Sequence, residues 1–299
     1  MDTHERLFIS WFVGDGFGSQ TEGMESEEIA SLVEGPLEEV YTLEEHQPLS
    51  GMSGVASDFT VLCGLSHLAL KEVDTDHLRA KYTTWAKERE GFSFPQKRDH
   101  ALALTRTPTF AVLAGHYPYT KWEALIRSET AITSSHPLAG DGALLLSRAF
   151  TFLAEDEAQG AEHLASLLIR EVGKRNLDPK LEVMLRTAVN QKPLAPVSDK
   201  ERTAVIPTLL VAFHTLLSGC AYEEGMDLIA KLGGNSRLTC AIYSTLKALI
   251  DGDGPPERWI DEIYPSDTLE AMIKSETLFR RETIKMERLA ASLAAGLQE

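Results

Sequence analysis

The chain has 299 residues, with 29 Lys or Arg against 45 Asp or Glu, which gives a formal net charge of −16. Its 43% hydrophobic and 25% charged residues are typical of a folded protein and exclude disorder along the whole length. The acidic excess argues against non-specific binding to nucleic acid or anionic membranes, because like charges repel. Three distant cysteines and the lack of a long apolar run exclude a disulfide framework, a zinc site and a membrane span. We therefore expect a cytoplasmic protein.

Apolar residues recur at spacings of three and four, which predicts helices throughout. A first helix carries Leu7, Phe8, Trp11 and Phe12 and ends near the glycines of 14–18. Residues 20–57 are rich in Glu, Gly and Ser and predict a long loop region with one short helix. Ser57 is predicted to cap the next helix, and Asp74 or Thr75 the one after it. Further helices are expected over 121–132, 138–155, 158–173, 179–190, 202–219, 222–232, 236–250 and 267–297. No turn-rich stretch, such as 193–198, is long enough for a linker, so we expect one all-α domain over 1–299.

Several local motifs occur together in a fixed order. The first helix ends in Gly14-Asp15-Gly16-Phe17-Gly18-Ser19-Gln20-Thr21-Glu22, and Ser57-Asp58-Phe59-Thr60 opens a later helix. Tyr82 and Trp85, the segment 132–139, Leu232-Gly233-Gly234-Asn235-Ser236-Arg237-Leu238 and Gly254 to Trp259 follow. Over residues 7–263 this pattern resembles the ADP-ribosylglycohydrolase family, also called the dinitrogenase-reductase-activating glycohydrolase family, with 264–299 as a helical extension. The resemblance implies a compact all-helical fold.

The resemblance also implies a chemistry. Family enzymes cleave the glycosidic bond between ADP-ribose and a modified arginine or serine, using two magnesium or manganese ions held by carboxylates and hydroxyls. Of the positions that supply these ligands, this chain keeps Glu22 and Asp58 and has Ser57 for a threonine. The other positions carry Phe59, Asn235, Arg237 and Leu238 in place of three aspartates and a threonine. We therefore expect no dinuclear metal centre and no cofactor.

Arg237 is the most informative of these substitutions. A buried carboxylate pair without cations is costly, because unpaired charge is disfavoured in a low-dielectric pocket. A guanidinium can neutralise two carboxylates through forked hydrogen bonds. We therefore predict that Arg237 stands in for the ions and neutralises both Glu22 and Asp58. The alternative is that Arg237 points to solvent from a helix start.

Further residues are candidate ligand contacts by their family positions. Ser134 stands where the family has its first histidine, and His136 matches the second. The segment before the helix near Pro137 offers N–H groups to a phosphate, although simple helix capping is the alternative. Asp15 is a candidate whose alternative is an internal hydrogen bond. The segment 107–112 matches the family's diphosphate loop poorly, so diphosphate binding stays unassigned. The complete set of candidate ligand-binding residues is Asp15, Ser57, Thr60, Ser134, Ser135, His136, Gly233, Gly234, Asn235 and Ser236.

Three functions are compatible with this pattern. The first is a metal-free protein that recognises ADP-ribose or an ADP-ribosylated protein. The second is a metal-independent hydrolase in which Glu22 or Asp58 is the general base and Arg237 stabilises charge. The third is a retired enzyme fold that binds a protein partner through its acidic surface or its C-terminal helix. Nucleic acid and membranes are not expected as partners.

Overall fold

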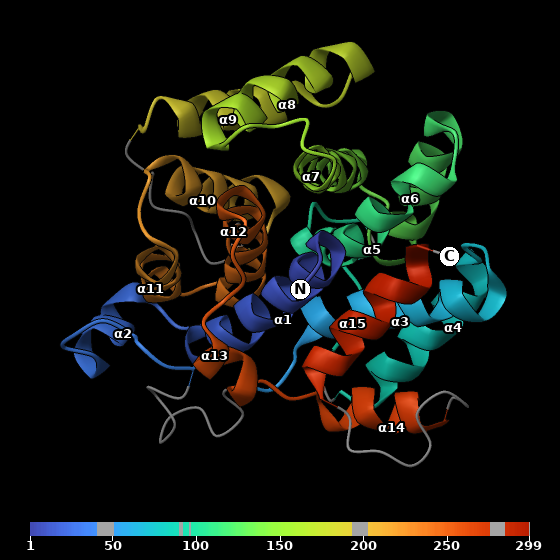
Figure 1. Cartoon of the computed structure of the whole chain (residues 1–299), viewed down its shortest axis with the longest axis horizontal. Coiled ribbons are helices and arrows are strands. Elements are labelled where there is room, and N and C mark those ends of the chain that lie inside the picture. Colours follow the sequence, from blue (N-terminus) through green and yellow to red (C-terminus); the bar gives the residue numbers. More distant parts are fainter. Residues whose placement is uncertain (41–50, 90–91, 96, 193–202, 276–284, 299) are drawn as a thin grey trace.

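The computed structural model describes residues 1–40, 51–89, 92–95, 97–192, 203–275 and 285–298 (Figure 1). Within these ranges the only extended pairing is an isolated parallel bridge between Met52 and Tyr264, so the predicted all-α fold is confirmed. No helix there is long and apolar enough to cross a membrane. The helices are α1 (Thr3–Gly18), η1 (Ser19–Thr21), α2 (Ser26–Leu32), α3 (Val55–Leu70), α4 (Thr75–Lys87), η2 (Ala101–Arg106), α5 (Thr107–Val112), η3 (Leu113–His116), α6 (Tyr119–Thr133), α7 (Pro137–Ala154), α8 (Ala161–Arg175), α9 (Pro179–Val189), α10 (Val205–Leu217), α11 (Tyr222–Leu232), α12 (Ser236–Asp251), α13 (Glu257–Glu262), α14 (Asp267–Ser275) and α15 (Met286–Gln298).

The central element is α1, which is buried on all sides from Leu7 to Gly18 and packs closely along α12 (Figure 1). Its glycines permit this approach. A Cβ at Gly14 would lie 2.4 Å from the Cα of Ala241, and one at Gly18 would lie 2.5 Å from the carbonyl oxygen of Ser236. The helix runs through Gly14 and ends at Gly18, within the glycine segment where the sequence predicted its end. The close crossing places the C-terminal end of α1 beside the N-terminal end of α12.

Most predicted helix boundaries hold, and the exceptions have local causes. Asp74 caps α4 by accepting hydrogen bonds from the N–H groups of Asp76 and His77, as predicted. The prediction for Ser57 is wrong: α3 begins at Val55 after Gly54, so Ser57 lies in the first turn. The helix expected over 267–297 is instead two helices, α14 and α15, and Lys285 before α15 is not helical. The turn at 193–198 and the start of the helix expected from 202 lie outside the described residues.

A short segment joins the C-terminal part of the chain to the start of α3. The N–H of Ser53 donates to the carbonyl of Tyr264 (2.8 Å), and the N–H of Tyr264 donates to the carbonyl of Gly51 (3.1 Å). These contacts hold residues 51–54 between the end of α1 and the stretch that precedes α14. The fold thus brings together four segments from distant parts of the sequence: the end of α1, residues 51–58, the start of α12 and residues 264–266.

Candidate functional site

Asp15 lies at the meeting point of these segments and is fully buried. Its Oδ2 accepts hydrogen bonds from the backbone N–H groups of Gly54 (2.7 Å) and Ser57 (3.0 Å). Both donors belong to the N–H groups at the start of α3 that have no acceptor within the helix, where a negative charge is also favoured by the helix dipole. Asp15 therefore uses one oxygen to anchor α3 against α1. Its other oxygen faces α12.

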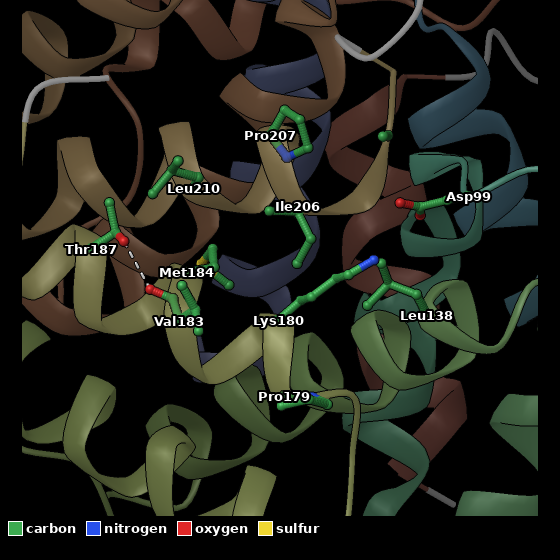
Figure 2. Close-up of a pocket in the computed structure, with 11 residues that line it drawn as sticks. Asp99, Leu138, Pro179, Lys180, Val183, Met184, Thr187, Ile206, Pro207 and Leu210 are labelled. Atoms are coloured by element: carbon green, nitrogen blue, oxygen red, sulfur yellow. Dashed lines mark hydrogen bonds between the residues drawn. The ribbon is translucent and has the colours of Figure 1, made fainter. Parts of the chain in front are cut away.

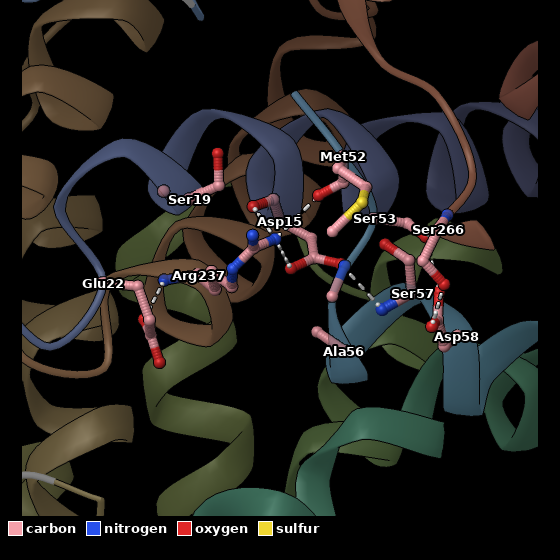
Figure 3. A network of polar contacts seen from close by, with 12 residues as sticks. Asp15, Ser19, Glu22, Met52, Ser53, Ala56, Ser57, Asp58, Arg237 and Ser266 are labelled. Carbon is pink, nitrogen blue, oxygen red and sulfur yellow. Dashed lines mark hydrogen bonds and ion pairs between the residues drawn. The ribbon is translucent and has the colours of Figure 1, made fainter. Parts of the chain in front are cut away.

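The Arg237 side chain occupies that second face of Asp15 (Figure 3). Its Nη1 lies 3.2 Å from Oδ1 of Asp15 and donates to the carbonyl of Met52 (2.8 Å). The side chain is only 16% exposed, so it does not point into solvent. A Cβ at residue 54 would lie 2.8 Å from Nη1 and 2.9 Å from Oδ1 of Asp15, so this pairing requires a glycine there.

The predicted fork from Arg237 to Glu22 and Asp58 is wrong in its partners, because the guanidinium instead contacts Asp15 and the carbonyl of Met52. The physical reason is the direction of side chains on α3. Ser57 and Asp58 are neighbours on a helix and point to different sides of it. The N–H of Ser57 faces Asp15, while the Asp58 side chain is turned toward α4 and residue 266 (Figure 3).

Asp58 is fully buried and its two oxygens are already occupied by donors. Oδ1 accepts from the hydroxyl of Ser53 (2.5 Å), while Oδ2 accepts from Nε1 of Trp85 (2.7 Å) and the hydroxyl of Ser266 (2.6 Å), with Arg89 Nη2 at 3.4 Å. Burial raises the pKa of Asp58 to about 6, and the three hydrogen bonds keep it from rising further. Both oxygens of the Asp58 carboxylate are thus engaged by protein donors, and the carboxylate is not open to a ligand.

Glu22 differs from Asp58 because the residue is exposed. Its Oε2 accepts from the backbone N–H of Arg237 (2.9 Å) and from the hydroxyl of Ser236 (3.2 Å), which lie in the first turn of α12. Although the residue as a whole is exposed, the protein packed around its carboxylate removes part of its hydration and raises its pKa, and the N–H and charge of Arg237 oppose that rise. Arg237 therefore contacts Glu22 through its backbone and Asp15 through its side chain.

The two glycines before α12 position the loop that carries Glu22. Gly233 and Gly234 have positive φ angles of 66° and 64°, which glycine adopts without strain. The N–H of Gly234 donates to the carbonyl of Met24 (3.0 Å), and the carbonyl of Gly234 accepts from the N–H of Gly23 (2.7 Å). These hydrogen bonds join the loop before α12 to residues 23–24, which directly follow Glu22.

The substituted motif positions have other partners. Phe59 stacks on Tyr82 with a ring-centroid distance of 4.4 Å and meets Trp85 at 4.9 Å, so it belongs to a buried aromatic cluster. Asn235 donates from Nδ2 to the hydroxyl of Thr208 on α10 (3.0 Å). Leu238 is part of the core.

The remaining candidates divide between capping and core. The hydroxyl of Ser57 is buried and has no hydrogen-bond partner among the described residues. Thr60 contacts the carbonyls of Ala56 and Thr105 inside the core. It therefore does not face Asp15, Glu22 and Arg237, which we call the Asp15 cluster. Ser134 donates to the carbonyl of Arg98 (2.7 Å). His136 caps α7 by accepting the N–H of Leu138, which matches the capping alternative, and Ser135 is exposed.

Sequence reasoning missed a pocket of about 640 Å³ where α9 and α10 meet the start of α7 (Figure 2). Its walls are largely apolar, and Asp99 and Lys180 are its charged lining residues. The pKa of Asp99 is raised, because burial outweighs the opposing effects of the hydrogen bond from Val205 and the charges of His136 and Lys180. Periodicity predicted the helices, but it does not say which of their faces meet across a pocket.

The pocket adjoins two of the family motifs. Leu138 lines it and lies two residues after His136, at the start of α7. Pro207 lines it and directly precedes Thr208, which bonds Asn235, two residues from Arg237. The hydrogen bond between Thr208 and Asn235 thus joins the first turn of α10, which lines the pocket, to the start of α12.

A buried ion pair was also missed. Arg106 and Glu129 are both buried, and Nε of Arg106 lies 2.8 Å from Oε1 of Glu129. Tyr82 donates to the same carboxylate (2.8 Å). The only signal in the sequence was a lone arginine within the apolar stretch 101–113. Residues 107–112, compared above with the diphosphate loop, form the buried helix α5.

Comparison with known proteins agrees with this architecture. Residues 7–287 match the family model described as ADP-ribosylglycohydrolase. None of the curated proteins matches the sequence. A solved structure described as an "ADP-ribosylglycohydrolase-related protein complex" superposes with a TM-score of 0.71 at 20% identity, covering 100% of this chain and 98% of that one. At that identity the likeness shows the fold alone. The match over nearly the whole sequence places this chain in the ADP-ribosylglycohydrolase family.

Proposed function

We propose that this family member lacks the dinuclear metal centre and recognises ADP-ribose or an ADP-ribosylated protein without it. The observation that carries the proposal is the position of Arg237: residue 237 stands where the motif resemblance implies an aspartate ligand, and its guanidinium is turned inward onto Asp15 with the side chain only 16% exposed. A fixed positive charge there opposes a divalent ion. Asp58 adds to the misfit, because donors already engage both of its oxygens and hard cations need several free oxygen ligands.

The pocket beside the cluster supports ligand recognition. Small-molecule sites are concave, mostly apolar and supplied with a few polar groups, and a volume of about 640 Å³ falls in their usual range. ADP-ribose has a nucleobase at one end and the ribose that bears the modified residue at the other. We place the base in the pocket and the distal ribose near Glu22 and Arg237 at the start of α12, which the hydrogen bond between Asn235 and Thr208 joins to α10 beside the pocket.

Calorimetry with ADP-ribose tests this proposal. Wild-type protein should release the same binding heat in EDTA as in millimolar magnesium. Arg237→Met should weaken binding, whereas Arg258→Met serves as a matched control, because Arg258 lies on the surface with its side chain 44% exposed. Absence of heat at millimolar ADP-ribose, or binding that requires magnesium, would contradict the proposal.

A second candidate is metal-independent hydrolysis, and the position of Glu22 favours it. The residue is exposed and its pKa is raised, and its hydrogen bonds from Ser236 and Arg237 both fall on Oε2. Glu22 would take a proton from water as the water oxygen bonds to the anomeric carbon and the glycosidic bond to the arginine nitrogen or serine oxygen breaks. The leaving atom would take up a proton from solvent, and Glu22 would return its own proton to solvent. General-base catalysis contributes about 10²–10⁴-fold in rate. Asp58 is an unsuitable base because it is fully buried.

Peptides carrying ADP-ribosylated arginine or serine distinguish the two candidates. Hydrolysis predicts release of ADP-ribose in EDTA by wild-type protein and a loss of about 10²-fold or more in Glu22→Gln. Binding without hydrolysis predicts no release above the protein-free rate. Mass spectrometry of the peptides measures both outcomes.

A further inference from the structure

The pocket between α9 and α10 is lined by one charged acceptor, Asp99, and one charged donor, Lys180, in apolar surroundings. Met184, Ile206, Pro207 and Leu138 contribute apolar walls. The hydroxyl of Thr187, which also lines the pocket, donates to the carbonyl of Val183 (2.9 Å) and is therefore engaged (Figure 2). The polar groups left for a ligand are the charged ends of Asp99 and Lys180.

Asp99 is held in place by one of its oxygens. Oδ1 accepts the N–H of Val205 at the start of α10 (3.3 Å), which fixes the carboxylate at the rim of the pocket. Among the described residues this hydrogen bond engages Oδ1 alone, so Oδ2 retains its capacity to accept. A carboxylate accepts several hydrogen bonds and donates none when ionised, so Asp99 selects a ligand group that carries N–H or O–H.

Lys180 supplies the donor. Its side chain extends across the pocket toward Leu138 and Asp99 (Figure 2). Within the described part of the chain its ammonium has no ion pair, although its charge acts on Asp99. The ammonium offers three donors and no acceptor, so it selects a ligand group with a lone pair.

An acceptor beside a donor complements one edge of adenine. The exocyclic amino group of adenine donates and its neighbouring ring nitrogen N1 accepts. Hypoxanthine reverses both roles, since it has a carbonyl oxygen in place of the amino group and carries a proton on N1. The carboxylate would then face an oxygen, and the ammonium would face an N–H. A site built to pair with such groups rejects the analogue that lacks them.

We propose that Asp99 and Lys180 read the amino edge of adenine and make the site specific for adenine nucleotides. This inference rests on the proposed function, because it assigns the pocket to the base of ADP-ribose. Asp99 accepts from the amino group through Oδ2, and Lys180 donates to N1. The apolar walls pack against the faces of the base.

The test compares ADP-ribose with its hypoxanthine counterpart, inosine diphosphate ribose, by calorimetry on the full chain. Wild-type protein should bind ADP-ribose about 10- to 100-fold more tightly, which is the effect expected of hydrogen bonds to charged groups. Asp99→Asn should abolish this preference, because an amide can present its NH₂ group to the carbonyl of hypoxanthine. Lys180→Met should also reduce the preference. Asn at residue 99 still accepts from Val205, and circular dichroism verifies that the variant is folded.

Asp253→Asn is the matched control, since Asp253 is exposed and lies on the turn after α12; it should keep the wild-type preference. If wild-type protein binds neither nucleotide, the proposed function fails and this inference fails with it. If wild-type protein binds both equally, or if Asp99→Asn keeps the preference, the inference alone is overturned and the proposed function stands.

Discussion

Replacing Arg237 by Met removes the positive charge beside Asp15 and keeps most of the side-chain volume. Removing one partner of a buried ion pair costs about 3–5 kcal/mol, because the remaining charge is buried without compensation. Asp15 is fully buried but keeps two backbone N–H donors, from Gly54 and Ser57. The Arg237 side chain is 16% exposed, which allows some entry of water. We therefore expect Arg237→Met to lower the free energy of unfolding by about 3 kcal/mol, at the low end of that range.

Urea unfolding followed by circular dichroism measures this change. Asp15→Asn removes the buried charge but keeps an oxygen for the two N–H donors, so the double variant Asp15→Asn/Arg237→Met should be more stable than the sum of the single effects predicts. The surface variant Arg258→Met should change stability little, because its ion pairs are exposed. Unfolding of Arg237→Met within 0.5 kcal/mol of wild type (about the expected effect of a neutral surface change), or additive effects in the double variant, would refute the reasoning.

Three further predictions follow from the same contacts. The pKa of Asp58 is about 6 in the folded protein against 3.8 ordinarily, so the unfolded chain ionises first as pH rises and the free energy of unfolding falls by about 3 kcal/mol between pH 3 and 7, of which about 2 kcal/mol falls between pH 4 and 6; urea titrations should show that this fall is absent in Asp58→Asn, and an unchanged fall would count against the assignment. Phe59→Asp should destabilise by about 4 kcal/mol or more with no rescue by magnesium, because the new charge lies in an aromatic cluster; rescue in thermal melts would instead indicate a metal site. Gly18→Ala should cost about 1–3 kcal/mol, since its Cβ would lie 2.5 Å from the Ser236 carbonyl, whereas Gly115→Ala, with open space around it, should melt at the wild-type temperature.

Periodicity and motif order predicted the helical fold because both reflect local physics: which face of a helix is apolar, and where it starts and stops. The inward position of Arg237 was predicted because, once the acidic ligands and their ions are lost, the remaining buried carboxylates need another cation to neutralise them. Its partner was not, because the choice between Asp15 and Asp58 depends on side-chain direction at the start of α3. That start lies at Val55 rather than after Ser57, and this shift changes which side chain faces the cluster.

The pocket that we assign to adenine was beyond prediction for a different reason. Asp99 precedes η2, Lys180 lies in the first turn of α9 and Leu138 in the first turn of α7, and no sequence pattern links the three segments. Their approach depends on how whole helices pack. The buried pair of Arg106 and Glu129 was hidden in the same way, since its partners are 23 residues apart on different helices.

The most direct test of the metal-free account is a crystal structure of the protein grown with ADP-ribose and manganese, with anomalous differences measured at the manganese edge. The account predicts the Arg237 guanidinium on Asp15, nucleotide between that cluster and Asp99, and no manganese peak among Asp15, Glu22 and Asp58. Two manganese peaks among those carboxylates, with Arg237 turned into solvent, would contradict it.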